Sequence, residues 1–286
     1  MAMSQNTNPR RSLLFVPGGR LEIFPKALTS GTDIACIDLE DAVADEIKAT
    51  VRADAIQLIA EHQSDSKVEI WLRVNSIRSA TGMADILALA EAETAPDGIM
   101  LPKISSAEEV RILRDVLSAK HPDLKFHPLI ETTEGLNAAF DIAKSSHKIG
   151  SLLLGGFDMS ANLRVEPGWD SLLFARQQLV LAAANAKVDL LDMPHFGLSD
   201  MEGLRQESEA ASAIGFTGKC AIHPKQIEII NQSFSPTAEE IAKALDLIAK
   251  YEAQDKAFVE IDGVLMEKPV VERLYRMVSI SERIKN

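Results

Sequence analysis

Short apolar segments alternate with helical segments eight times along about 230 residues, and this alternation constrains the fold more than any other feature. The apolar segments have the length of strands, and the segments between them repeat apolar residues every three or four positions, as amphipathic helices do. Strands that alternate with helices pair in parallel, because parallel strands need a crossover connection. The predicted strands are 12–16, 34–39, 68–74, 98–101, 126–130, 149–154, 188–193 and 219–222.

Eight strand–helix units in a chain of this length predict a closed (β/α)₈ TIM barrel, an α/β fold. An open, doubly wound sheet is the alternative, but no Gly-x-Gly-x-x-Gly motif follows the first strand, so dinucleotide binding has no support. After the eighth strand we expect a long helix, a hairpin turning at Asp262-Gly263, and a last helix. The predicted organisation is a disordered lead at 1–10, a barrel at 11–234 and a C-terminal helix–hairpin–helix lid or oligomerisation extension at 235–286.

Composition and charge exclude several classes of function. The 286 residues include 30 Lys and Arg against 42 Asp and Glu, a formal net charge of −12, and an acidic surface repels nucleic acid. No apolar run of about 18 residues predicts a membrane span, and the first ten residues lack the apolar core of a secretory signal. Cys36 and Cys220 both lie in apolar segments, so we expect reduced core thiols in a cytoplasmic protein.

Acidic residues stand near the ends of two consecutive predicted strands, where a barrel of this kind has its active site. Glu131 follows the fifth strand, and Asp158 ends the apolar stretch that contains the sixth. A carboxylate at a buried strand end is costly to desolvate unless something pairs with it, and oxygen ligands are those that Mg²⁺ prefers. We predict that Glu131 and Asp158 bind one Mg²⁺, with two solvated strand ends as the alternative. Zinc is not expected, because His195 and His223 lie on separate loops without metal-site spacing.

Further charged residues follow the other strands. Arg73 can grip a substrate carboxylate through two parallel hydrogen bonds, or it can close the barrel rim by a salt bridge to Glu40 or Asp41. Lys103 would need a depressed pKa to form a Schiff base, whereas neighbouring acids raise the pKa of a lysine. We therefore predict that Lys103 is an electrostatic partner of the acids and the metal. The predicted substrate-binding residues are Arg73, Glu131, Lys103, Glu40, Asp41 and Gly156.

Six motifs, in order along the chain, resemble those of a known family. They are RSLLFVPG at 11–18, DLEDAV at 38–43, RVN at 73–75, LPK at 101–103, IET at 130–132 and GFTGKCAIHP at 215–224. On these motifs the chain resembles the citrate lyase β-subunit-like family, within the HpcH/HpaI grouping of metal-dependent aldolases and acyl-CoA lyases. The resemblance runs from Arg11 to about Ile280, nearly the whole chain.

The resemblance implies a (β/α)₈ barrel, usually a homotrimer, that cleaves or forms a carbon–carbon bond in a short 3-hydroxyacyl-CoA of malyl or citramalyl type. The products of cleavage would be acetyl-CoA and a 2-oxoacid. The implied cofactor is Mg²⁺, and the implied partners are small molecules, an acyl-CoA or a 2-oxoacid. The implied catalytic residues are Arg73, Glu131, Asp158 and Glu267, the last acting in a neighbouring subunit's site, and Arg11 and Lys26 are implied to meet the CoA phosphates.

Two departures from the family pattern and three other functions stay open. Glu267 stands where the family has Asp, and Arg164 stands where it often has Gly. An aldolase on a CoA-free 2-oxoacid adduct is one alternative, although Ala42 replaces the His that commonly follows the acid in that group. An acyl-CoA thioesterase is the second alternative. A non-catalytic binding or scaffold paralogue is the third.

Overall fold

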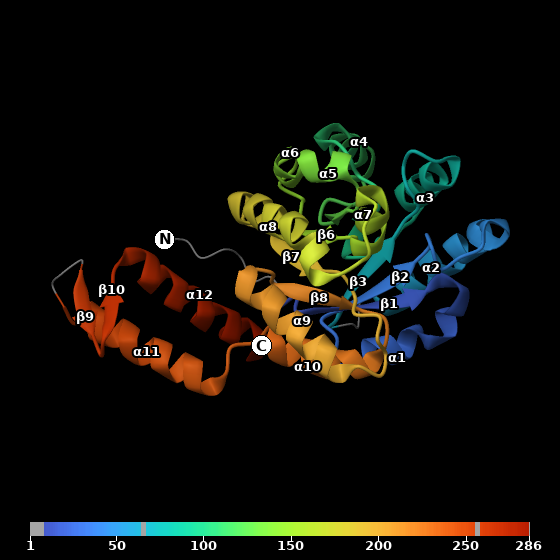
Figure 1. Cartoon of the computed structure of the whole chain (residues 1–286). Coiled ribbons are helices and arrows are strands. Elements are labelled where there is room, and N and C mark those ends of the chain that lie inside the picture. Colours follow the sequence, from blue (N-terminus) through green and yellow to red (C-terminus); the bar gives the residue numbers. More distant parts are fainter. Residues whose placement is uncertain (1–8, 64–66, 255–257, 286) are drawn as a thin grey trace. The chain divides into compact units, whose positions relative to one another are not determined.

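Eight parallel strands close into a barrel with helices around it (Figure 1). The computed structural model describes residues 9–63, 67–254 and 258–285, so most of the lead predicted at 1–10 lies outside the described residues. Neighbouring strands pair in chain order, and β1 pairs with β8 to close the ring, which confirms the predicted TIM barrel. The strands are β1 (Ser12–Pro17), β2 (Ile34–Asp38), β3 (Glu69–Arg73), β4 (Gly98–Leu101), β5 (Lys125–Ile130), β6 (Ser151–Leu154), β7 (Asp189–Asp192) and β8 (Gly218–Ala221).

Local capping signals set where several helices begin. Ser106 accepts a hydrogen bond from the Glu109 N–H while the Glu109 side chain returns to the Ser106 N–H, a capping box that satisfies two helix-end donors. Asp200 caps α9 (Met201–Ile214) and Ser79 caps α3 (Ala80–Glu91), each by accepting one backbone N–H without a returning side-chain bond. The α-helices of the barrel are α1 (Phe24–Leu28), α2 (Lys48–His62), α3 (Ala80–Glu91), α4 (Ala107–Leu117), α5 (Thr133–Asn137), α6 (Ala139–Ala143), α7 (Gly156–Leu163), α8 (Trp169–Ala186), α9 (Met201–Ile214) and α10 (Ile227–Ser233). Short 3₁₀ turns lie at η1 (Gly18–Ile23), η2 (Asp45–Ile47) and η3 (Pro224–Gln226).

Alternate residues of the strands point inward and fill the barrel with apolar side chains, as the two-residue period of a strand requires. Cys36 and Cys220 belong to this interior cluster as buried, free thiols, which confirms the prediction of core thiols. Burial raises the pKa of Cys220 to about 12, so its thiol is unreactive at neutral pH. The other buried members of the cluster are Leu13, Ile34, Trp71, Met100, Leu129, Leu153 and Leu191.

Polar side chains close the N-terminal end of the barrel. Arg10 Nε donates to both oxygens of Glu69, at 3.1 and 3.0 Å, and Arg10 NH1 lies 3.3 Å from Asp189 Oδ2. Trp71 Nε1 donates to Glu69 at 2.9 Å, and the His127 ring stacks on the Trp71 ring with centroids 3.4 Å apart. Because these residues fill one end, ligand binding is left to the opposite end, where the strands finish.

A second compact unit contains the C-terminal elements α11 (Ala238–Glu252), β9 (Val259–Ile261), β10 (Val264–Met266) and α12 (Lys268–Lys285). The two strands pair antiparallel, and Asp262 and Gly263 at their turn have φ of 51° and 74°, the left-handed values that favour Asp-Gly. The predicted helix–hairpin–helix is therefore confirmed. The first compact unit spans residues 10–231. Within the described residues, every helix is too short or too polar to cross a lipid bilayer.

Arg164 adopts a left-handed conformation where α7 ends, with φ of 62°. This conformation is consistent with the glycine that the family often has here, since a left-handed conformation costs a residue with a Cβ about 1–2 kcal/mol. Glycine avoids that cost but loses about 0.5–1 kcal/mol more backbone entropy on folding. We expect Arg164→Gly to raise the free energy of unfolding by about 0.5–1 kcal/mol, measured by urea denaturation. The control Arg164→Ala removes the side chain but keeps Cβ, and it should not stabilise. A less stable Arg164→Gly protein would contradict this account.

Candidate active site

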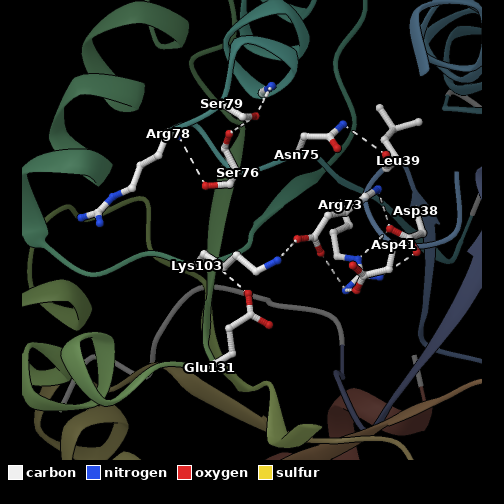
Figure 2. Close-up of polar contacts among 12 residues, drawn as sticks. Asp38, Leu39, Asp41, Arg73, Asn75, Ser76, Arg78, Ser79, Lys103 and Glu131 are labelled. Atoms are coloured by element: carbon white, nitrogen blue, oxygen red, sulfur yellow. Dashed lines mark hydrogen bonds and ion pairs between the residues drawn. The ribbon is translucent and has the colours of Figure 1, made fainter. Parts of the chain in front are cut away.

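Charged residues from four neighbouring strands converge at the carboxyl end of the barrel (Figure 2). Asp38 and Arg73 are the last residues of β2 and β3, which are paired in register at these positions. Lys103 follows β4 by two residues, and Glu131 follows β5 directly. Arg73, Lys103 and Glu131 therefore lie near one another, as expected from the sequence, because parallel strands present their carboxyl ends at one face. Asp38 was not among the predicted site residues.

Arg73 is already paired with three carboxylates. Its Nε and NH2 donate to the two oxygens of Asp38, each at 2.7 Å, and its NH1 lies 3.2 Å from Glu40 and 3.3 Å from Asp41. The guanidinium, 12% exposed, lies 5.1 Å from the centroid of the Phe15 ring. Burial alone would lower the pKa of Arg73, but the bonds and charges of these acids outweigh burial and raise it. The rim salt bridge that the sequence left open is therefore present, and its main partner is Asp38.

Lys103 joins the acids of the second and fifth strands. Its Nζ donates to Glu40 Oε1 at 2.8 Å, and its backbone N–H donates to Glu131 Oε1 at 2.7 Å. The hydrogen bond to Glu40 is the main cause that raises the pKa of Lys103, with Glu131 and Asp158 adding to it. A raised pKa is the opposite of what imine formation needs. Lys103 holds a φ of 55°, a left-handed value that turns its N–H toward the Glu131 carboxylate.

Glu131 is the most perturbed carboxyl of this group. Burial, followed by the charges of Glu40 and Asp158, raises its pKa to about 8. Its side chain is 2% exposed and lies against Gly155, where an added Cβ would stand 2.6 Å from Glu131 Oε2. Gly155 therefore leaves the space that this carboxylate occupies. A buried carboxylate in this electrostatic setting binds a proton or a cation strongly.

Asp158 lies on a helix, not at a strand end as the apolar pattern suggested. β6 stops at Leu154, and Asp158 is in the first turn of α7 with an exposed side chain. Its charge still raises the pKa of both Glu131 and Lys103, so it acts on the same region. Gly156 begins α7, and a Cβ there would clash with the Met193 sulfur. The error came from a short apolar run whose last residues fit strand and helix equally.

The donor set of this region fits Mg²⁺. Five carboxylates, those of Asp38, Glu40, Asp41, Glu131 and Asp158, interact here with two cationic side chains, those of Arg73 and Lys103. Glu40 Oε2 is buried and lies 3.2 Å from Arg73 NH1 without forming a hydrogen bond. Among the described residues, no group of three or more His, Cys, Asp or Glu side chains is arranged to hold a metal ion. Two protein carboxylates with water and substrate as the other ligands remain the arrangement that suits Mg²⁺.

A sequence model of the HpcH/HpaI aldolase/citrate lyase family matches residues 11–224. The chain belongs to this family. The mitochondrial citramalyl-CoA lyase of Rattus norvegicus is 29% identical over 296 residues, covering 97% of this chain and 87% of that protein. A (3S)-malyl-CoA thioesterase of Cereibacter sphaeroides is 32% identical over 270 residues, covering 93% and 92%. The structure of CitE from Mycobacterium tuberculosis in complex with magnesium, acetoacetate and coenzyme A has 27% identity and a TM-score of 0.81, covering 97% and 99%.

Two residues of the barrel that the family resemblance singled out, Arg11 and Lys26, lie outside this group. Arg11 precedes β1 and pairs with Asp33 through three hydrogen bonds of 2.8–2.9 Å. It lies at the amino end of its strand, and six residues at about 3.3 Å each separate it from the carboxyl end. Its placement therefore disagrees with a role at the barrel mouth. Lys26 is exposed on α1, beyond the carboxyl end of β1, and Glu267 is exposed between β10 and α12 in the second compact unit.

His195 and His223, the two histidines considered as zinc ligands, make their contacts outside the acid cluster. His195 Nδ1 lies 3.0 Å from Glu207, and the His195 carbonyl accepts a hydrogen bond from Gln226. His223 Nδ1 accepts from the Lys225 N–H where η3 begins. These contacts place both histidines in the packing of the loops after β7 and β8.

Sequence reasoning missed two buried polar residues beside the site, Asn75 and Asp85. Asn75 was noticed only as part of a motif, and Asp85 was not singled out at all. A signal for Asp85 was available, because residues 82, 85, 86 and 89 share one face of α3 and the other three are buried without charge. An ionisable residue on the buried face of a helix is rare unless it has a partner.

Proposed function

We propose that the protein is a Mg²⁺-dependent acyl-CoA lyase that cleaves or forms the carbon–carbon bond of a malyl- or citramalyl-type 3-hydroxyacyl-CoA. The products of cleavage are acetyl-CoA and a 2-oxoacid. Relatives named for lyase and thioesterase activity on such CoA esters support this class of substrate. The observation that carries the proposal is the buried Glu131 carboxylate, which Glu40 and Asp158 repel and which a backbone N–H orients.

Each member of the site has a proposed role. Glu131 and Asp158 hold Mg²⁺, which supplies Lewis acidity at the oxygen that becomes the ketone. Arg73 stays anchored to Asp38 and offers its remaining donor capacity to the substrate carboxylate. Lys103 holds Glu40 and Glu131 in place, and its hydrogen bond opposes the rise that burial causes in the pKa of Glu40. A carboxylate of the cluster accepts the proton of the substrate hydroxyl.

Three further assignments complete the proposal, and those of Glu267 and Lys26 rest on the family pattern. Glu267 of a neighbouring copy protonates the carbon released on the CoA side, which implies a closed oligomer, proposed as a homotrimer. Lys26, exposed beyond the end of β1, meets a CoA phosphate. Gly156, at the start of α7, meets the substrate through its backbone, which a residue without a side chain lets approach closely.

The test is an assay of purified protein with malyl-CoA and citramalyl-CoA, with Mg²⁺ or with a chelator. We expect a 2-oxoacid, trapped as its hydrazone, to appear with Mg²⁺ only and without free thiol. Free CoA thiol without a 2-oxoacid would identify a thioesterase instead. Turnover of a CoA-free hydroxy-oxoacid would identify an aldolase, and no turnover of any of these substrates would leave the binding or scaffold paralogue.

A further inference from the structure

A carboxylate in the middle of α3, that of Asp85, is buried beside the site with 1% exposure. Its Oδ2 accepts hydrogen bonds from the Asn75 backbone N–H at 2.7 Å and from Asn75 Nδ2 at 2.8 Å. Its Oδ1 accepts from Arg52 Nε at 2.5 Å. Both hydrogen bonds to Asp85 Oδ2 therefore come from one loop residue, Asn75, which stands two positions after Arg73.

Asn75 carries this contact to the neighbouring loop. Its Nδ2 also donates to the Leu39 carbonyl at 3.1 Å (Figure 2), and its Oδ1 accepts from Lys48 Nζ at 2.6 Å. The amide can face only one way, because Lys48 and Leu39 demand an acceptor and a donor respectively. The Leu39 N–H in turn donates to the Arg73 carbonyl at 2.9 Å. Leu39 directly precedes Glu40 and Asp41, the acids that contact Arg73 and Lys103.

The start of α3 is pressed against the same loop. A Cβ on Gly82 would clash with the Ser76 carbonyl oxygen, so the helix approaches this loop more closely than it could with any other residue at position 82. Ser79 caps the helix by accepting from the Gly82 N–H at 3.0 Å. Asp85 follows Gly82 by three residues on the same helix face, which directs its side chain back to Asn75.

Helix packing alone does not explain an acid at this position. A buried ion pair adds little stability compared with apolar residues of similar volume, and Ile86 and Leu89 already pack this face. A carboxylate at this position orients Asn75, because its Oδ2 accepts hydrogen bonds from both the Asn75 backbone N–H and the Asn75 side-chain amide, at 2.7 and 2.8 Å. Glu40 then meets Lys103 at 2.8 Å, and a misplacement of about 1 Å in such a site costs about 100-fold in rate.

We infer that Asp85 is a positioning residue that orients Asn75 and, through the Leu39 carbonyl, sets where Glu40 and Asp41 stand against Arg73 and Lys103. The inference deepens the proposed lyase and rests on it for the activity readout. The hydrogen bonds of the Asp85 carboxylate go to Asn75 and Arg52 and not to the acids of the cluster.

The experiment compares Asp85→Asn with Asp97→Asn. Asp97 is a matched control, because it also accepts from a backbone N–H, that of Ile70 at 2.8 Å, and from an amide, that of Gln63 at 2.6 Å, but it precedes β4 at the amino end. We expect Asp85→Asn to lose about 10- to 100-fold in kcat with little change in KM, whereas Asp97→Asn keeps its kcat within about threefold at a similar fall in Tm. Equal kcat in the two variants would overturn the inference.

A crystal structure of Asp85→Asn provides a readout that does not need activity. The Lys103 Nζ–Glu40 Oε1 distance of 2.8 Å is expected to exceed 3.5 Å in the variant, and an unchanged distance would overturn the inference even if the wild-type protein proves not to be a lyase. Should Asp85→Asn fail to fold, Asn75→Ser breaks the same link, since one hydroxyl hydrogen cannot serve both Asp85 and the Leu39 carbonyl. It is expected to show the same loss of kcat and the same lengthened distance, and wild-type values of both would overturn the inference.

Discussion

Replacing Glu131 by glutamine is expected to lower kcat/KM for the proposed cleavage by more than about 100-fold. The change keeps the shape of the side chain and its acceptor for the Lys103 N–H, which is 2.7 Å away. It removes the charge that a divalent cation needs, and the loss of residues that only support metal ligands already costs 10- to 100-fold. The measurement is kcat/KM at saturating Mg²⁺, with metal binding followed by titration calorimetry.

The same substitution is expected to stabilise the metal-free protein at alkaline pH. The pKa of Glu131 is raised from 4.5 to about 8 in the folded state, so the wild-type protein loses stability as pH rises through this window and the glutamine variant does not. The two proteins should match below pH 4.5 and differ by at most about 5 kcal/mol above pH 8, since each unit of pKa corresponds to about 1.4 kcal/mol. Urea denaturation with a chelator at pH 6 and pH 8.5 measures the growth of this difference.

Mg²⁺ and a matched variant complete the test of Glu131. Added Mg²⁺ should raise the Tm of the wild-type protein and leave that of Glu131→Gln unchanged, because only the folded protein with its carboxylate binds the ion. Glu134→Gln is the control, since the Glu134 side chain lies three residues away and is 71% exposed. Normal turnover in Glu131→Gln, or a Tm that Mg²⁺ raises equally in both proteins, would show that Glu131 holds no metal.

Replacing Arg73 by lysine is expected to lower kcat/KM by about 100-fold while the positive charge is kept. One ammonium cannot reproduce the two parallel bonds of 2.7 Å to Asp38 and also reach Glu40 and Asp41. Arg73→Ala should in addition lose about 3–5 kcal/mol of stability, because it leaves buried carboxylates without their partner. Steady-state kinetics and urea denaturation of both variants measure the two effects separately.

The kinetic pattern decides between the two roles of Arg73. A grip on the substrate carboxylate predicts a raised KM in Arg73→Lys, whereas a purely structural salt bridge predicts lost stability with the KM unchanged. Arg176→Lys is a matched control, because Arg176 is also buried and pairs with the last residue of a strand, Asp192, at 3.0 Å. It lies on α8 outside the acid cluster, so its loss should lower stability and spare turnover. Full turnover in Arg73→Lys would remove Arg73 from the site.

The barrel and the place of its site were predictable because they depend on local periodicity. The repeats that distinguish strands from helices lie in consecutive residues, and a chain with eight strand–helix alternations can bury its apolar strands in few folds. Once the strands are parallel, their last residues must share one face, which is why Arg73, Lys103 and Glu131 were found together. The Asp262-Gly263 hairpin was predictable for the same reason, since its left-handed turn is a property of those two residues.

Local pattern failed where a residue's role depends on distant neighbours. Asp158 was expected at a strand end because a short apolar run does not show where a strand stops and a helix begins, whereas it lies in the first turn of α7. Arg11 was assigned to the CoA phosphates by resemblance and not by local pattern; Asp33 holds it at the amino end of β1, and the assignment stays a prediction.

By itself, the sequence determined the eight-stranded barrel, the C-terminal helix–hairpin–helix and the set of acids and bases at the strand ends. Only the tertiary structure decided that Asp38 is the main partner of Arg73, that the pKa of Glu131 rises to about 8, and that Asp85 reaches Asn75. The reason is physical: hydrogen bonds and charge interactions change within about 1 Å of separation and with burial. Those distances are set by residues far apart in the chain, so no local pattern contains them.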